Sequence, residues 1–203
     1  GISRCDVSQA DQVARLFEEV GANLGALDVL INNAGIAGPT GGVEEISADD
    51  WRRTVDINLN GQFYCANRAV PMLKKSQNAS IMCISSVAGR LGYAYWTPYA
   101  ATKWAIIGLL KSLAIELGPS GICINAFLPG IVEGPRIETV TSERVRTQGV
   151  AYGEMEQKYI NKASLRGMVT AQGVANQAVF LCSSAGMNIS GQSLNICGTI
   201  EKQ

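Results

Sequence analysis

Short, continuous apolar runs alternate along this chain with longer segments in which apolar residues recur at helical spacing. The short runs have the length and the apolar, partly β-branched composition of strands. Because they are apolar throughout rather than at every second position, they are typical of parallel strands covered on both faces. The alternation predicts an α/β fold with a doubly wound parallel sheet in one domain, residues 1–203. The strands are expected at 28–35, 79–86, 121–130 and 192–198.

The helical segments carry recognisable start and stop signals. Ser47 and Asp50 form a capping-box pattern at the start of the longest segment. Thr97 and Pro98 have the residue types of an N-cap and a first helical position. Gly118 is typical of a helix end. The helices are expected at about 9–23, 47–75, 98–117 and 170–183.

The segment 134–169 departs from this rhythm, because it is polar and only partly helix-forming. It follows the carboxyl end of the strand at 121–130. Ligands of doubly wound sheets bind beyond the carboxyl ends of the strands. We therefore expect a substrate lid here, and a surface excursion is the other interpretation.

Composition narrows the chemistry and the partners. Histidine is absent, which excludes a Ser-His-Asp triad, a Cys-His pair and histidine-ligated metal. Lys+Arg and Asp+Glu both number 17, and no basic run appears, which argues against nucleic acid and anionic membranes as partners. The six cysteines form no CxxC pair, as expected for reduced thiols in a cytoplasmic protein. We expect neither a signal peptide nor a membrane span.

One chemically active pair stands out in the apolar helix at 98–117. Tyr99 and Lys103 are four residues apart, which places both side chains on one helix face. A neighbouring ammonium favours the phenolate and lowers the pKa of a tyrosine, so that it can exchange protons near neutral pH. An isolated pair of this kind is more simply read as two half-exposed surface residues. However, Ser85 and Ser86 end the preceding strand, and a hydroxyl there can reach the start of this helix.

Several motifs in this order resemble the classical short-chain dehydrogenase/reductase family. They are "NNAG" at 32–35, the asparagine within "DINLNG" at 56–61, "ISS" at 84–86, "YAATK" at 99–103 and "NAFLPG" at 125–130. The resemblance implies a Rossmann-like fold and covers essentially the whole chain. It corresponds to the latter three-quarters of the family's domain, so that the glycine-rich cofactor-binding segment has no counterpart. "GISRCDV" at 1–7 looks like the end of the family's third strand.

The resemblance also implies roles for individual residues. Tyr99 would be the general acid/base, and Lys103 would lower its pKa and hold the nicotinamide ribose. Ser86 would position the substrate oxygen, whereas Ser85 would be structural. Asn58 would hold a water of a proton relay. The cofactor, NAD or NADP, would also contact Asp6, Val7, Asn32, Ala34, Gly35, Pro129, Gly130 and Val132.

The implied reaction is hydride transfer between the cofactor and a secondary alcohol or ketone. Aromatic residues at 93–96 suggest an apolar or ring-bearing substrate, or else packing. The helix at 98–117 is apolar on more than one side, so we expect a homo-oligomer, a dimer or tetramer. Two alternatives remain: an inactive, truncated relative that serves as a scaffold or subunit, and, more distantly, a hydrolase using Ser86 and Lys103. The family's usual threonine, aspartate and second glycine are replaced by Gly134, Cys197 and Thr199.

Overall fold

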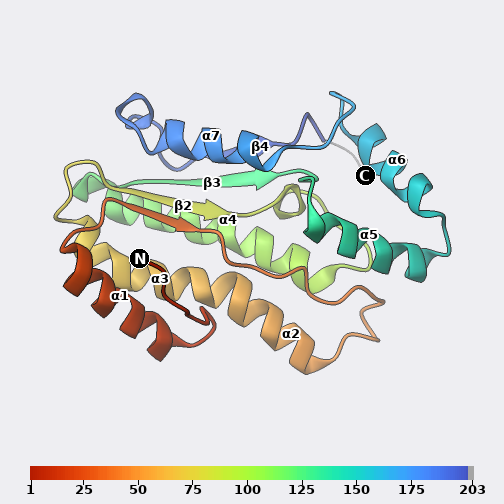
Figure 1. Ribbon diagram of the computed structural model, residues 1–203, viewed down its shortest axis with the longest axis horizontal. Helices are drawn as coiled ribbons and strands as arrows, with labels where there is room; N and C mark the ends of the chain where they lie inside the picture. Colours follow the sequence, from red (N-terminus) through yellow and green to blue (C-terminus); the bar gives the residue numbers. More distant parts are fainter. Residues whose placement is uncertain (201–203) are drawn as a thin grey trace.

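The computed structural model describes residues 1–200, except for the side chains of residues 147 and 148, and contains a four-stranded parallel sheet in the order β1-β2-β3-β4 (Figure 1). The strands are β1 (Val29–Asn32), β2 (Ser80–Ile84), β3 (Cys123–Pro129) and β4 (Ser193–Ile196). The helices are α1 (Ala10–Leu24), α2 (Ala48–Val55), α3 (Gly61–Leu73), α4 (Thr97–Leu117), α5 (Pro135–Gln148), α6 (Tyr152–Lys162) and α7 (Ala171–Leu181). All four predicted strands are confirmed.

Helices cover both faces of the sheet, which confirms the doubly wound architecture (Figure 1). Alternate residues of β2 point to opposite faces. Ile81 packs with residues of α3 and α4, whereas Met82 packs with Leu181 and other residues of α7. The continuous apolar runs of the sequence thus have a direct cause, because both faces of the central strands are buried.

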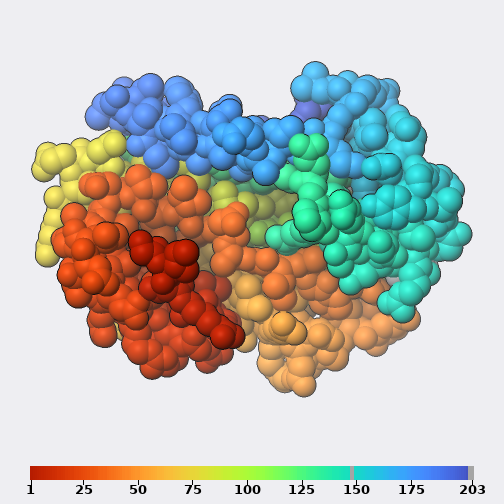
Figure 2. All heavy atoms as spheres, viewed as in Figure 1, coloured from red at the N-terminus to blue at the C-terminus, as the bar shows by residue number. Residues whose placement is uncertain are grey.

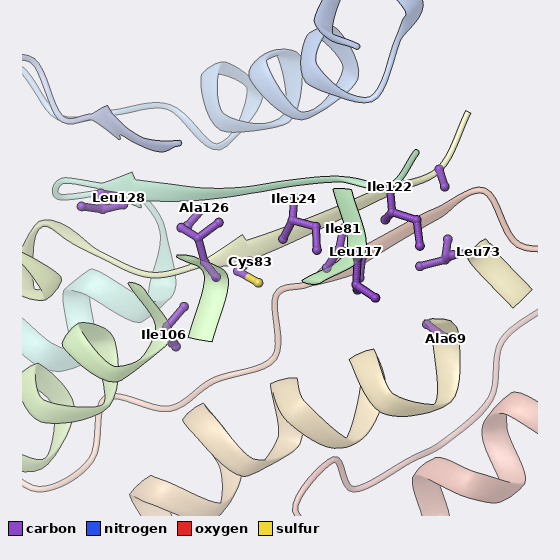
Figure 3. Close-up of a cluster of buried hydrophobic side chains, with 12 residues drawn as sticks. Ala69, Leu73, Ile81, Cys83, Ile106, Leu117, Ile122, Ile124, Ala126 and Leu128 are labelled. Atoms are coloured by element: carbon purple, nitrogen blue, oxygen red, sulfur yellow. The ribbon is translucent and has the colours of Figure 1, made fainter. Parts of the chain in front are cut away.

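The larger core cluster lies between the sheet and the helices α3 and α4 (Figure 3). Ile81 of β2 pairs in register with Ile124 of β3, and both side chains are fully buried. Truncating either to alanine would cost about 2–5 kcal/mol of stability. This core holds the ends of β2, β3 and α4 in fixed relative positions.

The helix predicted from Ser47 to Lys75 is interrupted. Ser47 caps α2 by accepting a hydrogen bond from the Asp50 backbone N–H at 3.0 Å, as its pattern predicts. Directly after the eight residues of α2 the chain forms a π-helical turn, Asp56–Asn60, before α3 continues. Such turns insert an extra residue and are frequent at functional sites. Here the turn contains Asn58, whose side chain is completely buried.

Two predictions, one about the start of α4 and one about the first residues of the chain, are wrong. Thr97 is the first residue of α4 rather than its N-cap, and Trp96 occupies the cap without a side-chain hydrogen bond to the helix. The Trp96 indole N–H instead donates to the Ala37 carbonyl at 2.7 Å. The segment "GISRCDV" forms no strand, because within the described residues no neighbouring strand pairs with it.

The polar segment after β3 folds into α5 and α6, which extend beyond the carboxyl ends of the strands (Figures 1 and 2). Its two ends are joined by a parallel bridge between Val132 and Val169. The backbone N–H of Glu133 donates to Val169, and that of Val169 donates to Ile131. The pair of helices is therefore tethered at its base. None of the described helices is long and apolar enough to cross a membrane.

Candidate active site

A cavity of about 410 Å³ opens where the carboxyl ends of β2 and β3 meet the start of α4 and the α5–α6 pair. This is the location that doubly wound sheets use for ligands. Three of the predicted catalytic residues, Ser86, Tyr99 and Lys103, line it. They come from two elements that pack on the same core, so the fold brings the predicted residues together.

The two serines after β2 point to different partners. The Ser85 hydroxyl donates to the Lys103 carbonyl at 2.8 Å and is buried, so it joins the strand end to α4. The Ser86 hydroxyl accepts from the Ala88 N–H at 3.2 Å and lies next to Tyr99. Of the two, Ser86 is therefore placed to meet a substrate oxygen together with the phenol.

Tyr99 and Lys103 lie side by side on α4, as their spacing predicts. The Lys103 Nζ is 5.4 Å from the centre of the Tyr99 ring and donates to the Ile84 carbonyl at 2.8 Å. Only 8% of Tyr99 and 4% of Lys103 is exposed. The surface-pair interpretation is thereby wrong, because both groups are buried at the cavity.

The predicted direction of the Tyr99 pKa shift is also wrong. Burial raises the pKa of this phenol, and the charge of Arg136, the hydrogen bond with Ser86 and the charge of Arg144 oppose that rise only in part. Lys103 is not among these causes. Burial, and then the charge of Arg136, lowers the pKa of Lys103 itself to about 7, so its ammonium is partly deprotonated at neutral pH.

Asn58 is fixed behind the cavity rather than at its surface. Its amide oxygen accepts from the Ile36 N–H at 2.8 Å, and its amide nitrogen donates to the Ile36 carbonyl at 3.0 Å and to the Thr102 hydroxyl at 3.2 Å. Gly35 lies beside it: a Cβ there would come within 3.2 Å of the Asn58 Oδ1 and 3.7 Å of the Lys103 Nζ. The absence of a side chain at Gly35 leaves this backbone open toward the lysine.

The predicted cofactor residues fall into two groups. Tyr99, Lys103, Pro129, Gly130 and Val132 line the cavity, and Gly35 adjoins it. The others do not line it. Asn32 is buried and donates to the Gln62 carbonyl, Ala34 is exposed, Asp6 accepts hydrogen bonds from Ser8, and Val7 packs against Gly61.

Several lining residues were not singled out individually in the sequence. Asn33 belongs to the "NNAG" motif but was passed over for its neighbours. Arg136, Val140 and Arg144 recur at intervals of four, which is the spacing of one helix face, and that pattern could have identified them. Tyr159 and Lys162 of α6 also line the cavity and have no comparable signal.

The aromatic residues at 93–96 do contribute to the cavity. Tyr93 and Trp96 line it, and the Trp96 ring stacks on Tyr99 with ring centres 4.2 Å apart and an interplanar angle of 15°. The Arg144 guanidinium lies over Trp96, 4.5 Å from its ring centre. Tyr95 instead faces solvent with a positive φ of 62°.

Comparisons with known proteins identify similar sequences and similar folds. A family model described as enoyl-(acyl carrier protein) reductase matches residues 2–198. A 3β-hydroxysteroid dehydrogenase of Mediterraneibacter gnavus is 37% identical over 166 residues, 81% of this chain and 60% of that protein. The 3-oxoacyl-[acyl-carrier-protein] reductase FabG of Staphylococcus aureus is 31% identical over 195 residues, 96% of this chain and 74% of that protein. The structure of ElxO with NADP bound superposes with a TM-score of 0.87 at 30% identity, covering 100% of this chain and 79% of that one.

Proposed function

The chain belongs to the short-chain dehydrogenase/reductase family, and from that membership we propose that it transfers hydride between NAD or NADP and a secondary alcohol or ketone. The observation that carries the proposal is the convergence of Ser86, Tyr99 and Lys103 in one cavity. The aligned relatives are oxidoreductases by name, and one matching structure holds NADP.

Tyr99 is the acid/base of the proposed reaction. Its phenol would protonate the carbonyl oxygen during reduction and take the proton back during oxidation. Burial alone would keep this phenol protonated, which suits the acid role in reduction. The charges of Arg136 and Arg144 and the hydrogen bond with Ser86 lower its pKa and so ease release of the proton.

Ser86 and Lys103 assist from opposite sides. The Ser86 hydroxyl would donate to the same substrate oxygen and hold it against the phenol. Lys103, whose Nζ is 5.4 Å from the centre of the Tyr99 ring, would hold the nicotinamide ribose beside the phenol. Asn58 would take part in a proton relay behind Lys103, together with the Ile36 backbone and the Thr102 hydroxyl to which it is hydrogen-bonded.

The residues present fit a nicotinamide cofactor on the sheet side of the cavity. Gly35 leaves an open backbone surface beside the Lys103 ammonium, and Gly130 and Val132 line the adjoining wall. Lys103 and Tyr99 would hold the ribose there, and Asp6, Val7, Asn32 and Ala34 would contact the adenosine half. When bound, the cofactor supplies or accepts the hydride.

Assembly and location form part of the same proposal. Trp104 and Ile115 of α4 are 51% and 81% exposed, which leaves the second apolar side of this helix unpartnered in one chain. We expect this side to be covered in a homodimer or homotetramer in the cytoplasm. Sedimentation velocity on the purified chain would test the assembly, and a monomer at all concentrations would contradict it.

The two alternatives are separable from this proposal. In a Ser-Lys hydrolase the ammonium or amine must serve Ser86, but Lys103 donates to the Ile84 carbonyl. An inactive scaffold remains consistent with the exposed cofactor positions Asp6 and Ala34. It would bind neither NADH nor NADPH.

The proposal is tested by measuring NADH- and NADPH-dependent reduction of a panel of ketones. Replacement Tyr99→Phe removes only the hydroxyl and should lower kcat by about 10²- to 10⁴-fold, the contribution expected of a general acid. Tyr64→Phe, on α3 and outside the cavity, is the matched control and should retain wild-type kcat. Undiminished turnover in Tyr99→Phe would remove this tyrosine from the mechanism.

A further inference from the structure

The α5–α6 side of the cavity contains a polar group that the proposed chemistry does not use. Tyr159 of α6 lines the cavity and is only 4% exposed, yet its hydroxyl has no hydrogen-bond partner among the described residues. Buried hydroxyls are nearly always paired, because burying one without a partner is unfavourable. An unpaired donor at a cavity surface indicates a ligand group that completes it.

Two cations lie at the same wall. The Arg144 guanidinium is 4.5 Å from the centre of the Trp96 ring and 6.0 Å from that of Tyr159, so two aromatic faces fix its position. Lys162, the last residue of α6, also lines the cavity. The ion pairs found within the described residues lie on α1, α2 and α6, and none includes Arg144 or Lys162.

These two cations also disfavour each other. Burial lowers the pKa of Lys162, and the charges of Arg144 and Lys158 lower it further. An anion between Arg144 and Lys162 would relieve that repulsion and accept a hydrogen bond from the Tyr159 hydroxyl. The site formed by Arg144, Tyr159 and Lys162 therefore has two positive charges and one neutral hydroxyl but no negative charge of its own.

The remaining charges around the cavity restrict where an anion can lie. Arg136 points toward the sheet side, where its guanidinium donates to the Gly35 carbonyl at 3.4 Å. Glu133, four residues after β3, is the single carboxylate among the described lining residues. An anionic group is thus repelled at the β3 end and attracted at the α5–α6 wall.

We propose, on the premise of the function above, that the substrate carries an acidic group, a carboxylate or a phosphate, bound by Arg144, Tyr159 and Lys162. The Trp96 ring is 4.2 Å from that of Tyr99 and 4.5 Å from the Arg144 Cζ, so the acidic group and the reacting carbonyl sit on one small molecule, a few bonds apart. The substrate class is therefore a short oxo acid or hydroxy acid, or the phosphate ester of a short hydroxyketone.

Calorimetric titration of the full chain with matched compounds tests this. Acetoacetate differs from its methyl ester by one negative charge, and dihydroxyacetone phosphate differs from dihydroxyacetone by about two at neutral pH. We expect at least one anion to bind about tenfold or more tightly than its neutral partner, the gain typical of charge-assisted hydrogen bonds. The pair with the larger difference identifies the group as carboxylate or phosphate.

Variants locate the preference. Arg144→Met and Tyr159→Phe should each weaken binding of the preferred anion severalfold without changing that of its neutral partner, and Arg144→Lys should restore part of the loss. Arg146→Met is the control, because Arg146 lies on the same helix as Arg144 but is exposed and does not line the cavity. Circular dichroism checks that each variant is folded, and Tyr159→Phe keeps the ring that packs there.

Three results would overturn the inference. They are an anion that binds no better than its neutral partner, a preference that survives both Arg144→Met and Tyr159→Phe, and inorganic phosphate binding as tightly as either oxo anion. Neutral ketones reduced without any preference for acids would leave the proposed function intact and remove the acid site. Anion binding at Arg144 without hydride transfer to any ketone would leave the acid site intact and remove the proposed function.

Discussion

The two walls of the cavity are built in different ways. The catalytic wall, Ser86, Tyr99 and Lys103, stands on the sheet core, and Ser86 and Lys103 are hydrogen-bonded to the backbone beside that core. The α5–α6 wall, Arg144, Tyr159 and Lys162, belongs to an excursion joined to the sheet through the Val132–Val169 bridge. No ion pair among the described residues includes Arg144 or Lys162, and the Tyr159 hydroxyl has no hydrogen-bond partner there.

This difference separates two requirements of an enzyme. Proton transfer needs groups held within narrow distances, which a packed core provides. Substrate selection can be placed on a segment that leaves and rejoins the sheet, because its changes leave the core untouched. Changes at the catalytic wall should therefore affect kcat or stability. Changes at the α5–α6 wall should affect mainly substrate affinity, although the charge of Arg144 also acts on the pKa of Tyr99.

The largest effect in this comparison is expected from Lys103→Met. It removes the ammonium beside Tyr99 and the hydrogen bond to Ile84, so we expect kcat to fall about 100-fold, in the lower part of the range for acid–base assistance. Cofactor affinity should fall as well. Lys111→Met, two turns along the same helix and outside the cavity, is the control. A variant that lost stability alone, with kcat preserved, would make Lys103 a structural residue.

The neighbouring serines should divide rate from stability. Ser86→Ala should lower kcat by about tenfold or more, because a charge-assisted hydrogen bond to the reacting oxygen is lost. Ser85→Ala should leave kcat nearly unchanged but lower the free energy of unfolding by about 1–3 kcal/mol, since the Lys103 carbonyl loses its buried donor. Steady-state kinetics and urea unfolding on the same samples measure both. Equal kinetic losses in the two variants would refute the division of roles.

A smaller effect concerns pH and stability. The pKa of Lys103 is about 7 in the folded chain and 10.5 as its ordinary value, so between these values the unfolded chain binds the extra proton. The free energy of unfolding from this group therefore rises as pH increases from about 7, and the contribution is lost as pH falls toward 7. We expect the wild type to gain stability relative to Lys103→Met between pH 7 and 9. If the difference in unfolding free energy between the two proteins stayed constant over that range, the pKa of Lys103 would not be lowered.

The sequence predicts the core of the molecule well for a physical reason. Strands buried on both faces must be continuously apolar, so β2 and β3 are visible in the residues alone. "ISS" lies at the end of β2 and "YAATK" near the start of α4, as expected. The same reasoning misplaces the cap of α4, because the Trp96 side chain bonds to a segment distant in sequence. It also misses the π-helical turn at Asn58, which conserves helical spacing to within one residue.

The direction of the Tyr99 pKa shift shows a further limit. Spacing identifies Lys103 as a neighbour, but the shift depends on burial and on Arg136 and Arg144, which reach the site from α5. The α5–α6 wall is hidden for the same reason, since Tyr159 and Lys162 gain their meaning only from the folded cavity. Local patterns predict elements and strand-end residues; contacts between distant segments decide charge and affinity.

The central claim is most directly tested by titrating the 203-residue chain with NADH and with NADPH while following nicotinamide fluorescence, and then adding a ketone. The account predicts saturable binding of at least one nucleotide by both the wild type and Tyr99→Phe, and ketone-dependent loss of the signal in the wild type alone. Absence of binding of either nucleotide, or equal loss of signal in Tyr99→Phe, would contradict it.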